Sequence, residues 1–363
     1  MIKIIPIQEA YRRKIDRQAA LKGLKYQCYG SCAYTGKDIS PGCYGCFYSD
    51  AFFGSFMLGR DLGLPDICNK DCLYCFEPHE VRQELLLPRA WKISNAWKEA
   101  FKRDLLAERL RITTDCKMQY YEFSGVCEPL LYLPVMEDLM QFLRSVVDPL
   151  MGTRGWAKIY TNGTLLNLDN ILRLKEMGFD EVRIHPGATG FSSGVYENMR
   201  LAVKNIPTVT VETPAWPPHR EKLFEMLPII QEIGIKHLNI CQVEITHPRQ
   251  VERIEAALGE VQLYQAFYPV MDDGGLVEDL MREVIERNYS YSVLDCNGFV
   301  KQSRSALTDR SYWSLLNRRF PVEWEKQRLH RKLNADQGSV LGNQKQLYGG
   351  DVNADSQTNQ HSA

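Results

Sequence analysis

Three closely spaced cysteines are the residues of this chain best suited to chemistry. Seven of the 11 cysteines lie between residues 28 and 75, and the last three, Cys68, Cys72 and Cys75, follow the spacing C-x3-C-x2-C. Three thiolates on one tight loop can bind three irons of a cubane 4Fe-4S cluster, whereas a closed structural zinc site normally takes four protein ligands. The spacing therefore indicates an iron-sulfur cluster with one iron left open for chemistry.

This loop resembles the signature of the radical S-adenosylmethionine (SAM) superfamily, whose three cysteines bind a 4Fe-4S cluster. Residues Glu122–Pro129 resemble the superfamily's strand-end Gly-Gly-Glu-Pro motif, with Val126 and Cys127 in place of the paired glycines, and Lys158–Thr164 is similar to the next strand end. The resemblance implies SAM as cofactor. The residues that it implies for SAM binding are Tyr74, which precedes the third cysteine, and Gly125, Glu128, Pro129, Thr161 and Asn162.

Further segments of the chain resemble one particular group within this superfamily. Residues 40–305 are similar to a group of radical SAM proteins described as related to pyruvate formate-lyase activating enzyme. The segments that carry this likeness are Gly42–Cys46, Asp180–Pro186, Glu212–Pro217, Leu238–Glu244 and Leu294–Lys301.

A second set of cysteines precedes the first. Cys28, Cys32, Cys43 and Cys46 form two pairs, with the spacing C-x3-C-x10-C-x2-C. Four paired thiolates suit zinc, a mononuclear iron or an auxiliary 4Fe-4S cluster, although buried thiols that only pack are the plainer interpretation. In the resembling group an early C-x2-C and a late cysteine recur, which makes Cys296 an alternative ligand.

Strand and helix patterns alternate after the three-cysteine loop. Five β-rich runs, 118–124, 157–161, 181–185, 208–212 and 237–244, are separated by amphipathic stretches such as 135–146 and 276–285. Strands connected by helices pair in parallel and curl into a barrel with its active site at the strand C-termini. The resemblance makes this an α/β fold with a partial TIM-type (β/α)6 barrel.

Several polar residues fall at the expected strand ends. Among them His185, Glu212 and Glu244 are candidates for catalysis. A barrel-mouth histidine with satisfied hydrogen bonds is the plainer interpretation for His185, whereas either glutamate is costly to bury unpaired.

Length and composition indicate the domain organisation, the kinds of partner and the location of the protein. We expect an N-terminal cysteine-rich extension over residues 1–60, the barrel over 61–305, a helical extension over 306–333 and a disordered tail over 334–363. A net charge of -1, from 44 basic against 45 acidic residues, gives no broad phosphate-binding surface, so nucleic acid is not an expected partner. The sequence begins without a secretory signal pattern and holds no apolar run of about 20 residues, which favours a cytoplasmic protein with no membrane partner.

The leading hypothesis is a radical SAM enzyme that cleaves SAM reductively and abstracts hydrogen from a peptide or protein substrate. It would need an electron donor such as flavodoxin or ferredoxin. One alternative is an activase that places a glycyl radical on a partner enzyme. An alternative of another class is a non-catalytic zinc-binding scaffold, with His79 as a fourth ligand beside the three-cysteine loop.

Overall fold

The computed structural model describes residues 2–27, 32–43, 51–56, 58–59, 62–75, 79–85, 92–111, 118–124, 127–245, 248–264 and 270–296. The chain divides into two units, Met1–Lys301 and Gln302–Ala363, and every described residue belongs to the first. The helical extension and the tail expected after residue 305 lie outside the described residues.

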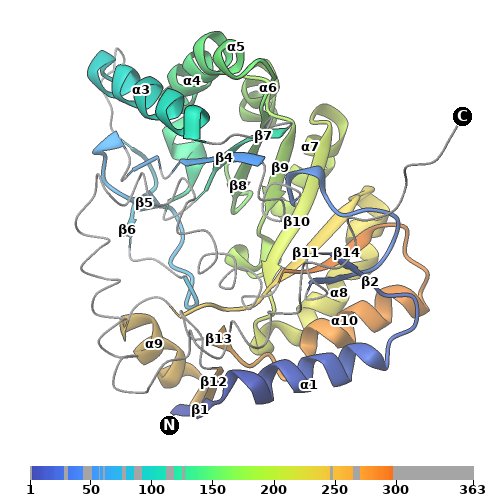
Figure 1. Ribbon diagram of the computed structural model, residues 1–363. Coiled ribbons are helices and arrows are strands. Elements are labelled where there is room, and N and C mark those ends of the chain that lie inside the picture. Colours follow the sequence, from blue (N-terminus) through green and yellow to red (C-terminus); the bar gives the residue numbers. More distant parts are fainter. Residues whose placement is uncertain are drawn as a thin grey trace, which may run out of the picture. The chain divides into compact units, whose positions relative to one another are not determined.

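A nine-stranded sheet forms the centre of the first unit (Figure 1). From one edge its parallel strands are β4 (Ala51–Phe56), β7 (Met118–Phe123), β8 (Trp156–Thr161), β9 (Glu181–Ile184), β10 (Thr208–Pro214), β11 (His237–Cys241) and β14 (Ser292–Cys296). The short strands β3 (Cys32–Tyr34) and β2 (Lys25–Gln27) continue the sheet beyond β14 in antiparallel pairing. The parallel strands follow one another across the sheet in chain order, with helices in the connections between them.

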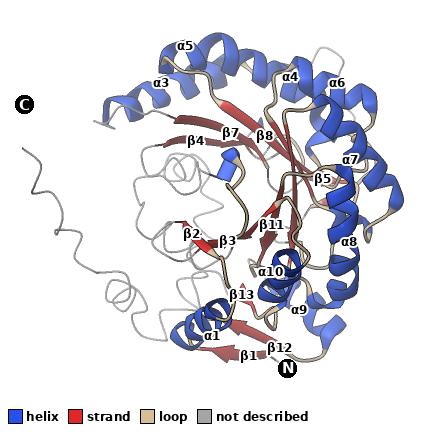
Figure 2. Ribbon diagram, turned by 90° about the vertical axis from the view of Figure 1, so that its right-hand side faces the viewer, coloured by secondary structure: helices blue, strands red, loops and turns tan. Residues whose placement is uncertain are grey.

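Helices cover one face of this curved sheet (Figure 2). Their bounds are α3 (Asn95–Arg111), α4 (Leu133–Phe142), the π-helical turn η3 (Leu143–Val147), α5 (Asp148–Met151), α6 (Leu168–Glu176), α7 (Ser193–Asn205), α8 (Arg220–Ile233) and α10 (Leu276–Glu286). Helices α6 and α8 are followed by Gly178 and Gly234, whose positive φ angles of 78° and 86° suit glycine best.

The observed sheet confirms the α/β fold class and extends the expected barrel. Each of the five predicted β-rich runs contains a strand of the sheet, because β-branched and aromatic residues favour the extended backbone. Strand β4 was not expected: it lies in the segment assigned to an N-terminal extension, yet it pairs along its length with β7. Strand β14 adds a further parallel strand beside β11.

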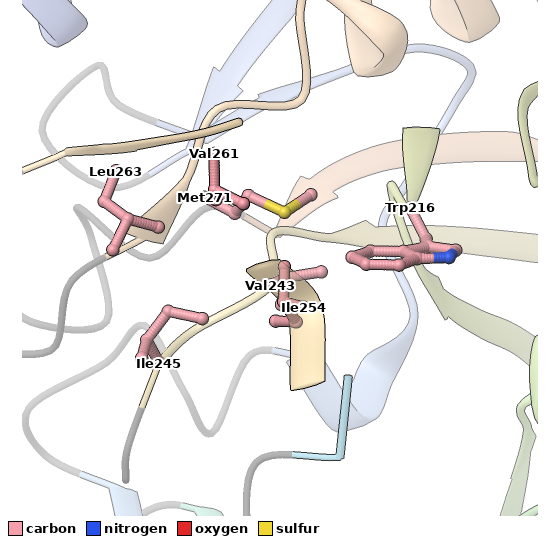
Figure 3. Close-up of a cluster of buried hydrophobic side chains, with 7 residues drawn as sticks. All are labelled: Trp216, Val243, Ile245, Ile254, Val261, Leu263 and Met271. Atoms are coloured by element: carbon pink, nitrogen blue, oxygen red, sulfur yellow. The ribbon is translucent and has the colours of Figure 1, made fainter. Parts of the chain in front are cut away.

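A smaller sheet joins the beginning and the later part of the unit. Strand β1 (Ile2–Ile5) pairs in parallel with β12 (Val261–Tyr264), which pairs antiparallel with β13 (Val270–Met271). Helix α9 (Pro248–Leu258) packs beside it through a cluster of buried side chains shown in Figure 3, namely Trp216, Val243, Ile245, Ile254, Val261, Leu263 and Met271. Leu73 and Tyr74, which lie in the three-cysteine loop, pack against this cluster.

Helix α1 (Ile7–Ala19) is fixed to the main sheet by a buried ion pair. Lys14 Nζ lies 3.0 Å from a carboxylate oxygen of Glu278 on α10 and 2.8 Å from one of Asp295 on β14. Burial alone would lower the pKa of Lys14, but these two carboxylates outweigh it and raise the pKa. The same contacts hold the C-terminal end of β14 in place.

Candidate active site

The three-cysteine loop follows strand β5 (Ile67–Cys68), which pairs with β6 (Glu80–Val81). A tight turn brings the backbone N–H of Cys75 to the carbonyl of Cys72 at 3.1 Å, and all three cysteine side chains are partly exposed. Burial raises the pKa of the Cys68 thiol to about 11, and burial with the nearby Cys75 and Cys68 thiols raises the pKa of Cys72 to about 12. Thiolates here therefore need a strong positive charge beside them, which bound irons would supply.

The three sulfurs do not form a compact site for a single ion. Among the described residues, the one group of three metal-ligating atoms within 4.8 Å of each other is elsewhere, so at least two of the sulfurs of Cys68, Cys72 and Cys75 lie farther apart than that. Ligands of a cubane bind different irons and are more widely spaced than ligands of one ion. The loop therefore has the donor set of a three-cysteine 4Fe-4S site.

His79 lies beside the loop, where the zinc alternative would need it. Its Nδ1 is 3.6 Å from Cys75 Sγ, and its Nε2 is 2.7 Å from the carbonyl oxygen of Lys70. Because a carbonyl only accepts, Nε2 carries the proton and the Nδ1 lone pair faces the sulfur. Cys75 and His79 could therefore both bind zinc, or Cys75 alone could bind a cluster with His79 beside it. Metal analysis distinguishes these two cases.

An amide network joins the loop to the end of strand β8. Asn162 Nδ2 donates to Asn69 Oδ1 at 2.7 Å and lies 3.9 Å from Cys68 Sγ. Asn69 in turn donates to Thr164 Oγ1 at 2.8 Å. The structure therefore brings Asn162, one of the residues assigned to SAM binding, to the side of the first cysteine.

Glu128 also connects the cysteine loop to the end of strand β8. Its backbone N–H donates to the carbonyl of Ile67 at 3.0 Å, and its carboxylate accepts from Thr161 Oγ1 at 2.6 Å and from the Asn162 N–H at 2.8 Å. The same carboxylate caps the 3-10 helix η2 (Pro129–Tyr132), with Leu130 N–H at 3.3 Å. Burial raises the pKa of Glu128 to about 7 in spite of these donors. Its visible role is to hold the cluster loop, η2 and the end of β8 together.

Tyr74 packs the loop onto the buried cluster of Figure 3. Its ring lies 5.3 Å from the ring of Trp216, and Leu73 and Tyr74 both contact the cluster. Its hydroxyl is 3.0 Å from His185 Nε2. An aromatic wall therefore links the loop to the ends of β9 and β10.

A small cradle lies where these ends meet. A Cβ on Gly187, in the 3-10 helix η4 (Pro186–Thr189), would come within 2.8 Å of His185 Cε1, 2.9 Å of Tyr74 Oη and 3.0 Å of Thr213 Oγ1. In this described region, the buried atoms His185 Nδ1 and Thr213 Oγ1 have no hydrogen-bond partner. Burial also lowers the pKa of His185 to about 4, so the ring is neutral near pH 7. Two unused polar atoms beside a space kept by a glycine suit a polar ligand group.

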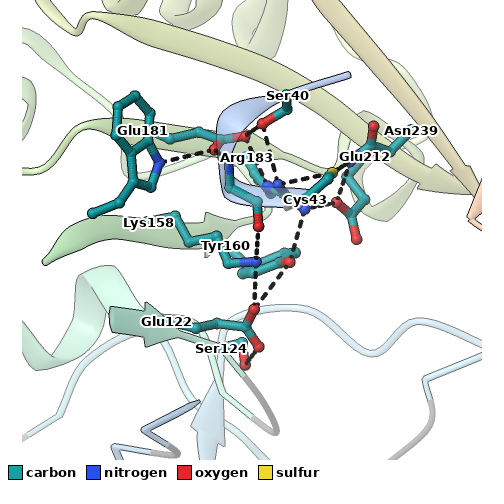
Figure 4. A network of polar contacts seen from close by, with 12 residues as sticks. Ser40, Cys43, Glu122, Ser124, Lys158, Tyr160, Glu181, Arg183, Glu212 and Asn239 are labelled. Atoms are coloured by element: carbon teal, nitrogen blue, oxygen red, sulfur yellow. Dashed lines mark hydrogen bonds and ion pairs between the residues drawn. The ribbon is translucent and has the colours of Figure 1, made fainter. Parts of the chain in front are cut away.

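A network of charged and polar side chains lies on the inner face of the main sheet (Figure 4). Lys158 Nζ lies 2.7 Å from Glu122 Oε2, and Arg183 binds Glu181 at 2.8 Å and Glu212 at 2.7 Å. Burial alone would raise the pKa of Glu181, but Arg183 and Lys158 outweigh it and lower that pKa to about 2. The sequence analysis did not find this network, because opposite charges on neighbouring strands are far apart along the chain.

Residues 40–43 enter this network from the N-terminal segment. Ser40 Oγ donates to Glu181 at 2.5 Å, Lys158 Nζ donates to the carbonyl of Gly42 at 3.0 Å, and Cys43 Sγ lies 3.2 Å from Arg183 Nη2. A Cβ on Gly42 would be 2.2 Å from Glu181 Oε2, which explains a glycine at this position. Cys43 is therefore buried in the barrel interior.

The remaining expected residues divide into those that the structure describes and those that it does not. Gly125, Cys28, Cys46 and the side chain of Cys32 lie outside the description, so the four-cysteine site stays a prediction. Glu244 lies beyond β11, where it bridges to Val270 next to the cluster of Figure 3. Cys241 lies with Cys296 and Glu212 in one tight group.

The comparisons with known proteins give one distant relative. No family model matches the chain. The putative glycyl-radical enzyme activating enzyme MJ0021 of Methanocaldococcus jannaschii is 25% identical over 193 residues, which cover 51% of this chain and 47% of the relative. The chain thus spans about half the length of the curated relative it matches.

Solved structures with partial likeness include a tagged form of anSMEcpe with bound AdoMet, 17% identical with a TM-score of 0.38, which covers 52% of this chain and 49% of that one. SuiB of Streptococcus suis bound to precursor peptide SuiA is 11% identical with a TM-score of 0.41, and the likeness covers 79% of this chain and 60% of SuiB.

The likeness to this relative, the cysteine loop and the motifs that follow it all agree with the resemblance to the radical SAM superfamily. That resemblance implies a 4Fe-4S cluster and SAM as cofactors. Within the described ranges, no helix is long and apolar enough to cross a bilayer.

Proposed function

We propose that this chain is a radical SAM enzyme whose cluster is held by Cys68, Cys72 and Cys75. When bound, the cluster and SAM would supply the chemistry of reductive SAM cleavage, in which one electron gives methionine and a 5'-deoxyadenosyl radical able to abstract hydrogen from a substrate. The observation that carries the proposal is the joining of Cys68, Asn162, Thr161 and Glu128 in one hydrogen-bonded frame. The motif residues are thus gathered around the cysteine loop.

The chain's own residues would position SAM and exclude water. The Asn162 side chain lies beside Cys68, and the Glu128 carboxylate fixes the backbone of Asn162. These two residues would therefore line the SAM site next to the cysteine loop. His185 Nδ1 and Thr213 Oγ1 would bond to polar groups of the bound cofactor in the space that Gly187 keeps. Tyr74 and Trp216 close the apolar side of this space. Such fixed groups accelerate reactions mainly by orientation.

The inner charged network would form the floor under the substrate. Glu122 and Glu212 are the partly exposed members of this network, each with 13% of its side chain accessible, whereas Lys158 and Glu181 are fully buried. A buried network with fixed partners keeps its shape during turnover. We propose a peptide or protein substrate, with flavodoxin or ferredoxin as the electron donor.

The test is SAM cleavage by the full-length chain after anaerobic reconstitution with iron and sulfide. With dithionite the wild-type protein should form 5'-deoxyadenosine, measured by liquid chromatography, and should hold about four irons and matching sulfide at this loop. Cys72→Ala should lose both. Cys116→Ala is the matched control, because this cysteine lies outside the loop and outside the motifs that follow it. Cleavage that survives Cys72→Ala would overturn the assignment, and zinc without sulfide would favour the scaffold.

A second candidate function is activation of a glycyl-radical enzyme. It is favoured by the name of the relative MJ0021, which is called a putative glycyl-radical enzyme activating enzyme. Incubation of the reduced protein and SAM with a glycyl-radical enzyme encoded beside its gene should then give the doublet of a glycyl radical in electron paramagnetic resonance. If 5'-deoxyadenosine forms without that doublet, a peptide or protein that is not a glycyl-radical enzyme is the better substrate class.

A further inference from the structure

Two cysteines lie side by side at the C-terminal ends of β11 and β14. The parallel register pairs Cys241 directly with Cys296, so both side chains leave the same face of the sheet. The next strand, β10, places Glu212 opposite Asn239, two residues before Cys241 and therefore on that face as well. Ligand atoms of Glu212, Cys241 and Cys296 all lie within 4.8 Å of one another.

The Glu212 carboxylate is held in a fixed orientation. One oxygen, Oε2, accepts from Arg183 Nη1 at 2.7 Å and from Asn239 Nδ2 at 2.9 Å (Figure 4). The other oxygen, Oε1, lies 3.4 Å from Cys241 Sγ. This is the arrangement of a metal ligand whose second oxygen is fixed by outer hydrogen bonds.

We propose that Glu212, Cys241 and Cys296 bind a single divalent metal ion, either zinc or iron(II). Thiolates and carboxylates are the ligands these ions accept, and three protein ligands suffice for a zinc site whose fourth position takes water or substrate. Tetrahedral bonds of ~2.3 Å place two sulfurs ~3.8 Å apart, which agrees with a group contained within 4.8 Å. This tight group favours one ion over a cluster.

The charges agree with a cation at this position. Two thiolates and a carboxylate carry three negative charges, and a divalent ion leaves one. The guanidinium of Arg183, which also pairs with Glu181, is in direct contact with Glu212 and reduces the effect of that remaining charge. All three ligand residues are partly exposed, so an ion can reach them.

The site uses none of the residues of the cluster loop, so it can be tested separately. The probe is zinc or cobalt(II), added anaerobically to the full-length chain in which Cys68, Cys72 and Cys75 of the loop and Cys28, Cys32 and Cys46 of the predicted four-cysteine site are all alanine. We expect one bound ion per chain, and for cobalt the charge-transfer absorption of thiolate ligands together with the intense visible bands of a tetrahedral ion. Zinc should also protect Cys241 and Cys296 from alkylation, but not Cys127, as read by mass spectrometry of the peptides.

Further variants identify the ligands. In that background Cys241→Ala and Cys296→Ala should each abolish the thiolate spectrum. Asn239→Ala should weaken binding by about 10- to 100-fold, the usual effect of removing an outer hydrogen bond. Glu212→Gln keeps the side-chain shape, so it should lower affinity while the circular dichroism spectrum stays unchanged.

Three outcomes would overturn the proposal. They are the absence of a bound ion, metal binding that survives Cys241→Ala and Cys296→Ala, and a disulfide between these two cysteines that persists under reducing conditions. None of these outcomes depends on SAM cleavage by the wild-type enzyme.

Discussion

Replacing Glu128 by glutamine should remove a pH dependence from the stability of this chain. The Glu128 side chain is buried, and this burial raises its pKa from 4.5 to about 7. The folded chain therefore holds the proton more tightly than the unfolded chain. The free energy of unfolding that this group contributes is fully present below pH 4.5, and it is lost as the pH rises through 7.

The magnitude follows from the size of the shift. Each unit of pKa is worth about 1.4 kcal/mol, so a rise from 4.5 to about 7 corresponds to about 3 kcal/mol of stability lost across that window. Three donors, Thr161 Oγ1, Asn162 N–H and Leu130 N–H, stabilise the ionised form, but burial opposes them with the larger effect. Glutamine does not titrate, so the free energy of unfolding of Glu128→Gln lacks this pH-dependent contribution.

The assay is urea unfolding of the metal-free, reduced full-length chain over a series of pH values. The wild-type free energy of unfolding, minus that of Glu128→Gln, should fall by about 3 kcal/mol between pH 4.5 and pH 8. The matched control is Glu137→Gln, an exposed glutamate paired with Arg173, which should change stability by at most about 1 kcal/mol. A difference for Glu128→Gln that does not vary with pH would refute the reasoning, since the three donors would then balance the effect of burial on the pKa.

Three further substitutions test the cofactor frame and the barrel interior. Glu128→Ala should weaken SAM binding by about 10- to 150-fold in equilibrium dialysis, because it removes the carboxylate that fixes Thr161 and Asn162, and one hydrogen bond to a charged group is worth about 1.5–3 kcal/mol. An unchanged dissociation constant would contradict the assignment. Gly187→Ala puts a methyl group within 3.0 Å of atoms of His185, Tyr74 and Thr213, so it should reduce SAM binding by at least about 10-fold, whereas normal binding would mean that the cradle holds no cofactor. Gly42→Ala puts a Cβ 2.2 Å from Glu181 Oε2 and should lower the free energy of unfolding by about 1–3 kcal/mol, and an unshifted urea midpoint would show that residues 40–43 do not pack into the charged network as described.

The sequence by itself determined the local features of this protein. The spacing of Cys68, Cys72 and Cys75 needs only a short loop, and the β-branched and aromatic runs that became β7 to β11 have strong local preferences. The glycine stops at Gly178 and Gly234 are equally local, since each takes a positive φ where a helix ends. Alternation of strands and helices then restricted the topology to a parallel sheet.

Only the tertiary structure decided which distant residues meet. Cys241 and Cys296 are 55 positions apart and become neighbours through the register of β11 and β14, and neither cysteine's local sequence specifies that register. The same holds for Gly42 against Glu181, and for the charges of Lys158, Arg183 and Glu212 on adjacent strands. Hydrophobic pattern indicates which face of a strand is buried, but partners across a sheet depend on pairing and register, which are properties of the assembled sheet.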